Sequence, residues 1–79
     1  MPLPGLPAGA TPPADEKLWE LRIGTRIAVC WRRRHTHGFQ LRVDVNGDTL
    51  RTTVEPTEAG ADEASHHMYR SMLDRGWRA

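Results

Sequence analysis

The sequence predicts an α+β domain, in which a four-stranded antiparallel β-meander carries one C-terminal α-helix packed on one face. Two observations lead to this prediction. Between residues 18 and 54, apolar residues alternate with polar ones in segments that are separated by turn residues. After Pro56 the apolar spacing changes to about 3.6 residues, the period of an α-helix.

The first two strands are predicted at residues 18–23 and 26–34, and Gly24-Thr25 joins them. A glycine in the first central position suits a two-residue type II′ turn. This loop pairs Leu21 with Ala28 and Trp19 with Cys30, so the second strand turns small residues toward the core.

The next connection favours the same register. Residues 35–38 form a four-residue loop in which Gly38 takes a positive φ. That loop pairs Arg34 with Phe39, and it again places the small residues of the second strand inside. A three-residue first loop, combined with a five-residue second loop that begins at Arg33, would instead turn Val29 and Trp31 inward. This alternative stays open.

Asn46-Gly47 marks the hairpin between the third and fourth strands. Both residues tolerate the positive φ that a type I′ turn requires at its two central positions. A two-residue loop predicts four facing pairs: Val45 with Asp48, Val43 with Leu50, Leu41 with Thr52, and Phe39 with Val54. Directly opposed residues share a face, so the apolar residues of both strands would lie on the core side.

The helix is predicted after Pro56. Its apolar stripe contains Ala61, Ala64, Met68 and Met72, with Tyr69 and Leu73 beside it. Thr57 or Asp62 could cap its start. Gly76 suits a left-handed stop, which would bring Trp77 back onto the helix.

Residues 1–16 are rich in proline, glycine and alanine, and we expect them to form a mobile tail before a single ββββα domain at 17–79. The alternative is an extended segment along a partner or a sheet edge. The start lacks the features of a secretory signal, and no apolar run is long enough to span a membrane. A single cysteine fits a reducing cytoplasm. We therefore predict a cytoplasmic protein without a membrane partner.

The sheet face opposite the helix is the candidate partner-binding surface. In the preferred register it presents an apolar strip set among charged side chains, and tryptophan and arginine dominate binding hot spots. The candidate residues are Ile27, Val29, Trp31, Arg33, Arg42 and Arg51. We predict a non-catalytic protein-binding module that acts as a homodimer, an adaptor or an inhibitor. If the other register holds, or if the tail folds over the strip, this surface is lost.

A nucleic-acid-binding domain is the alternative function. Arg33, Arg34, Arg42 and Arg51 would neutralise phosphates, and Trp31 would stack on an unpaired base. A net charge of +1 and the acidic residues on the same face count against it.

Metal binding and catalysis find little support. The candidate ligands are His35, His37, His66, His67 and Cys30, but their spacing matches no common zinc motif. Cys30 is expected to be a buried thiol rather than a nucleophile, since it lacks an adjacent base and a cleft. The carboxylates at Asp44, Asp48, Glu55 and Glu58 show no catalytic pairing. We predict that the protein is not an enzyme and uses no cofactor.

One resemblance accompanies these predictions. The layout Trp-Glu-Leu-Arg-x-Gly, Ala-x-Cys, Gly-x-x-Leu-Arg, Asn-Gly and a final Gly-Trp, spread over residues 19–77, resembles small uncharacterised bacterial proteins of similar length. This resemblance implies no activity and transfers no site residues. In size and plan the chain is also similar to phage-encoded anti-CRISPR inhibitors. That likeness is one of architecture, and it implies a small protein that blocks a larger machine by surface contact.

Overall fold

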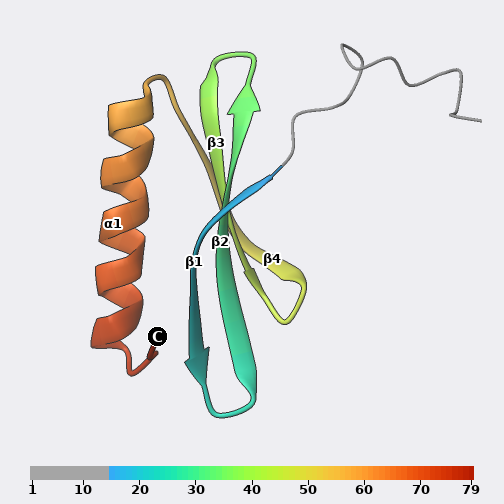
Figure 1. Ribbon diagram of the computed structural model, residues 1–79, viewed down its shortest axis with the longest axis vertical. Coiled ribbons are helices and arrows are strands. Elements are labelled where there is room, and N and C mark those ends of the chain that lie inside the picture. Colours follow the sequence, from blue (N-terminus) through green and yellow to red (C-terminus); the bar gives the residue numbers. More distant parts are fainter. Residues whose placement is uncertain (1–14) are drawn as a thin grey trace, which may run out of the picture.

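The computed structural model describes residues 15–79, which form two layers: an antiparallel sheet and one helix on a single face of it (Figure 1). The strands are β1 (Glu16–Ile23), β2 (Arg26–His35), β3 (Gly38–Val45) and β4 (Asp48–Glu55), and the helix is α1 (Glu58–Asp74). The strands lie in the order β1-β2-β3-β4, so β1 and β4 are the two edges. The predicted fold class and order of elements are confirmed.

The preferred register of the first three strands is confirmed. Leu21 faces Ala28, and Cys30 lies between Trp19 and Val43. Because Ala28 and Cys30 have small side chains and are fully buried, α1 can pack close to the centre of the sheet. A β-bulge at Leu18 interrupts β1 near its start.

The turn between β2 and β3 is tighter than predicted. His35 still pairs with Gly38, so the loop has two residues rather than four. Gly38 adopts a φ of +136°, and a Cβ at this position would overlap with the carbonyl oxygen of Glu55 and with Pro56. Glycine is needed here because the start of β3 and the end of β4 pass each other closely.

The β3–β4 hairpin departs from the predicted register. The turn itself is confirmed, since Asn46 and Gly47 have φ values of 51° and 87° and Val45 faces Asp48. A bulge then shifts the pairing by one residue, so three of the four predicted pairs are wrong. Arg51 faces Val43, Thr53 faces Leu41, and Glu55 faces Phe39.

The shift has a physical reason. Register is strongly specified where one face of a strand is buried. Most of β4 is exposed, with Leu50 at 65% and Val54 at 40%. Placing the apolar residues of β4 on the core side would therefore bury little additional apolar surface.

The core lies between the sheet and α1. Its buried apolar residues are Leu21, Ala28, Cys30, Leu41, Val43, Val45, Ala61, Met72 and Trp77. Thr57 caps the start of α1, where its hydroxyl accepts a hydrogen bond from the Gly60 N–H at 3.0 Å. At the other end the Trp77 N–H donates to the Met72 carbonyl at 3.1 Å, and Gly76 has a φ of +101°. These contacts form the predicted Schellman ending.

The folded part begins earlier than predicted. Glu16 belongs to β1, and its carboxylate accepts a hydrogen bond from Arg32 at 2.7 Å. Asp15 is also held by arginines of the sheet. β1 therefore begins one residue before the expected boundary at Lys17, and charged contacts that the composition did not reveal hold Asp15 and Glu16 against the sheet. The rest of the expected tail lies outside the described residues.

No helix in the described part of the chain is long and apolar enough to cross a membrane.

Candidate protein-binding surfaces

Three apolar side chains of β2 lie on the outer face of the sheet, the face turned away from α1. Ile27, Val29 and Trp31 are each partly exposed. Their cross-strand neighbours are long or charged: Trp31 lies between Lys17 and Arg42. Because the methylene groups of lysine and arginine can cover apolar surface, these neighbours reduce the exposed area of the strip but do not bury it completely.

Beside this strip runs a ladder of ion pairs. Asp15 accepts hydrogen bonds from Arg33 Nε at 2.7 Å and from Arg42 Nη2 at 3.1 Å. Arg42 Nε also donates to Asp44 at 3.1 Å, and the Thr49 hydroxyl donates to the same carboxylate at 3.0 Å. The outer face therefore presents an apolar strip and an ordered polar border.

The ladder also explains the electrostatics of Asp15. The hydrogen bond from Arg33 lowers the pKa of this carboxyl, and the Arg42 contact adds to the effect, while partial desolvation opposes both. Sequence analysis missed Asp15 because it belongs to a segment whose composition predicts a tail. No signal in the sequence alone indicated that it would reach two arginines on β2 and β3.

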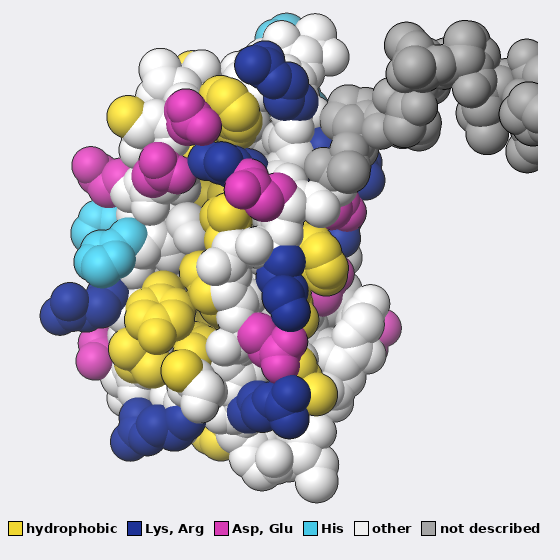
Figure 2. Space-filling model, viewed as in Figure 1, with side chains coloured by type: hydrophobic (Ala, Val, Ile, Leu, Met, Phe, Trp, Pro, Cys, Tyr) yellow, Lys and Arg dark blue, Asp and Glu magenta, His cyan; other side chains and the backbone are white. Residues whose placement is uncertain are grey.

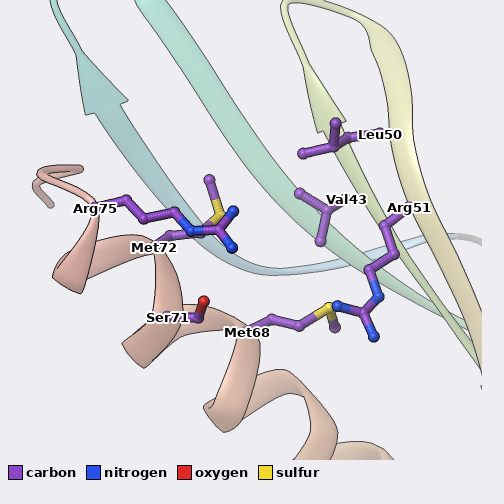
Figure 3. A pocket seen from close by; sticks show the side chains of 7 residues that line it. All are labelled: Val43, Leu50, Arg51, Met68, Ser71, Met72 and Arg75. Carbon is purple, nitrogen blue, oxygen red and sulfur yellow. The ribbon is translucent and has the colours of Figure 1, made fainter.

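Five of the six predicted surface residues lie on the outer face: Ile27, Val29, Trp31, Arg33 and Arg42. Arg51 does not. Because of the bulge it faces Val43, and its side chain lies on the same side of the sheet as α1 (Figure 3). The predicted placement of Arg51 on the outer face is wrong.

Arg51 instead lines a groove between α1 and the β3–β4 hairpin (Figure 3). The groove has a volume of about 240 Å³, and its lining residues are Val43, Leu50, Arg51, Met68, Ser71, Met72 and Arg75. This volume falls below the roughly 300–1,000 Å³ of typical small-molecule sites. A second hollow, of about 470 Å³, adjoins the groove and continues along β4 past Thr53 to Glu55.

The arginines proposed to contact nucleic acid do not share one face. Arg33 and Arg42 lie on the outer face, where Asp15 pairs with both. Arg34 lies on the opposite side, with its guanidinium 5.5 Å from the centre of the Phe39 ring, and Arg51 also faces α1. On the side of the molecule shown in Figure 2, basic and acidic side chains are intermixed around hydrophobic ones. The positive charge is therefore divided between the two faces of the sheet and does not form one continuous basic surface.

The remaining candidate residues lie apart. Within residues 15–79, no three histidine, cysteine or acidic side chains are placed to hold a metal ion. His35 Nδ1 accepts a hydrogen bond from the His37 N–H at 3.1 Å, which orders the β2–β3 turn. Burial raises the pKa of the Cys30 thiol, and a hydrogen bond with Ser65 opposes this only in part. A thiol in this state is a weak nucleophile at neutral pH.

Comparison with family models, with curated proteins and with solved structures found no match for this chain.

Proposed function

We propose that the chain is a non-catalytic, cytoplasmic protein-binding module that acts as a homodimer, an adaptor or an inhibitor, and that it binds its partner through the outer face of the sheet. The observation that carries this proposal is the strip of Ile27, Val29 and Trp31, which α1 does not cover. An apolar strip with a partly exposed tryptophan, bordered by arginine, has the composition of a binding hot spot.

The energetics support a contact of moderate strength. Complete burial of each apolar side chain of the strip would contribute on the order of 1.5–3 kcal/mol before the costs of association. The ion-pair ladder beside the strip would add specificity more than affinity, since the charges of Arg33 and Arg42 are already partly compensated by Asp15.

The test is to compare Trp31→Ala with the wild type in capture of partners from cells of the source organism, followed by affinity measurement for each captured protein. We expect Trp31→Ala to weaken the relevant complex by about 2 kcal/mol, or roughly 30-fold in Kd. His66→Ala, at an exposed position on α1, is the matched control and should leave the affinity unchanged.

Circular dichroism and urea unfolding show whether the variant is folded. If Trp31→Ala unfolds the protein, the indole is a core residue and the proposed surface fails. If Trp31→Ala binds every captured protein as tightly as the wild type does, the surface fails as well. Nucleic-acid binding is tested separately through tryptophan quenching by oligonucleotides at low salt, and strong salt-dependent quenching would favour that alternative over a protein partner.

A further inference from the structure

The outer edge of β4 has no role in the proposed function. The other edge of the sheet is partly closed, because Arg78 pairs with Arg22 of β1. Within residues 15–79, β4 pairs with β3 alone. After the bulge at Leu50, β4 runs regularly from Arg51 to Glu55, and the strand contains neither lysine nor proline, which commonly protect edge strands from pairing with other chains.

The sequence of this edge is complementary to itself. Two copies of one strand related by a two-fold axis perpendicular to the sheet can pair only residues that lie on the same face. With Thr53 opposite Thr53, each Arg51 faces Glu55 of the second copy, and each Thr52 faces Val54. Opposite charges and threonine pairs are favourable cross-strand neighbours.

The two charged residues are available for this contact. Arg51 and Glu55 form no salt bridge with any side chain in the described part of the chain. Both lie on the α1 side of β4 and line the hollow beside α1. In Figure 3 the Arg51 side chain extends from β4 along this hollow toward Met68. A strand added at the edge would place its own charged side chains on the same side.

The same pairing would also cover apolar surface. Leu50, the bulged residue just before the regular part of β4, is 65% exposed, and Pro56, directly after the strand, is exposed as well. In the register centred on Thr53, Leu50 of one chain comes next to Pro56 of the other at each end of the paired segment. The pairing therefore matches charge with charge and apolar surface with apolar surface.

We propose that a second copy of this chain pairs antiparallel along β4, centred on Thr53, so that the two sheets join into one. Both helices then lie on one face of the joined sheet, and both Trp31 strips lie on the other. The module becomes bivalent, although the edge contact itself does not depend on the outer face.

The experiment reverses the charges one at a time and then mixes the two variants. Arg51→Glu places Glu opposite Glu55, and Glu55→Arg places Arg opposite Arg51. Each variant alone should raise the dimer Kd by about tenfold or more, measured by analytical ultracentrifugation over a concentration series. An equimolar mixture should restore the dimer as a heterodimer, because each chain then carries a single sign of charge at both positions.

Arg70→Glu and Glu63→Arg make the same charge changes at exposed positions on α1, and they should dimerise as the wild type does. Circular dichroism confirms that every variant is folded. A wild-type protein that stays monomeric at millimolar concentration overturns the proposal. So does a dimer that both charge reversals leave intact, or a mixture that remains monomeric. Trp31→Ala should leave this dimer unchanged, which separates the edge contact from the outer face.

Discussion

At the scale of single residues, a small polar cluster inside the core explains the position of Trp19. The indole Nε1 donates a hydrogen bond of 2.9 Å to the hydroxyl of Ser65, which is buried on α1. The ring also meets Tyr69 edge to face, with 5.5 Å between the ring centres. The indole thus fills apolar space while its N–H finds a partner, and this holds α1 in one orientation over β1.

Sequence analysis did not find Ser65. The predicted stripe of α1 used apolar residues only, and a serine inside the stripe gave no reason to pair it with an indole 46 positions earlier. Such a pair becomes visible only when the register of β1 and the rotation of α1 are both known. Patterns of hydrophobicity predict which face is buried, but not which polar groups meet there.

Ser65→Ala should lower the free energy of unfolding by about 1–3 kcal/mol, because it leaves the indole N–H of Trp19 without an acceptor. Urea unfolding, monitored by tryptophan fluorescence, measures the loss of stability. Ser71→Ala, at an exposed position on the same helix, should change stability by less than about 0.5 kcal/mol. Equal effects of the two substitutions would show that the hydrogen bond contributes nothing.

At the scale of elements, the hairpins differ in how strongly the core specifies them. The register of β1, β2 and β3 could be predicted only from the lengths of the connecting loops, because β2 is apolar on both faces and its hydrophobic pattern leaves the alternative open. In the structure this register buries Leu21, Cys30 and Val43 under α1. A slip by one residue would expose all of them. The β4 register could not be predicted in this way, since its apolar residues gain little burial on either face. Its turn residues predict where the hairpin closes but not the bulge that follows.

The β2–β3 turn offers a test at this scale, because Gly38 is held between two strands. Gly38→Ala should cost about 3 kcal/mol, since the residue has a φ of +136° and a Cβ would overlap with the backbone of Glu55 and Pro56. The midpoint of thermal or urea unfolding measures this cost.

Gly24→Ala is the matched control. Gly24 also has a positive φ, of +58°, but no atom lies within 4 Å of the position that a Cβ would take. Its substitution should therefore cost only the backbone strain, about 1–2 kcal/mol. If both variants lose the same stability, the close approach of β3 and β4 at Gly38 is not a constraint on the fold.

At the scale of the whole molecule, ion pairs determine how the charged side chains are arranged on the two faces of the sheet. The net charge of +1 conceals a division into separate groups. On the α1 side, Arg32 is paired with Glu16, Glu58 and Asp62. On the outer face, Asp15 bridges Arg33 and Arg42. Alternation along β2 predicts that neighbouring arginines lie on opposite faces of the sheet. Which of these arginines remain free to bind a partner depends on acidic residues far away in the sequence.

The Asp15 bridge should make stability depend on pH. Because Arg33 and Arg42 lower the pKa of Asp15 in the folded state, the ionised carboxylate stabilises the fold at neutral pH. That contribution is complete above the ordinary aspartate pKa of about 4 and is lost as the pH falls through the lower folded-state value. Asp15→Asn should therefore be less stable than the wild type at pH 7, and this gap in the free energy of unfolding should shrink as the pH falls through the folded-state pKa of Asp15.

Urea unfolding of both proteins between pH 7 and pH 2 measures the gap. In an Arg33→Gln background, which lacks the donor with the largest effect on Asp15, the gap at pH 7 should be narrower. A gap that stays constant from pH 7 to pH 2 would mean that Asp15 is not bound to the arginines in solution. The start of β1 would then be free of the outer face, and the border beside Trp31 would consist of an unpaired Arg33 and an Arg42 that only Asp44 compensates. A partner with acidic side chains would bind that face more tightly than a neutral one.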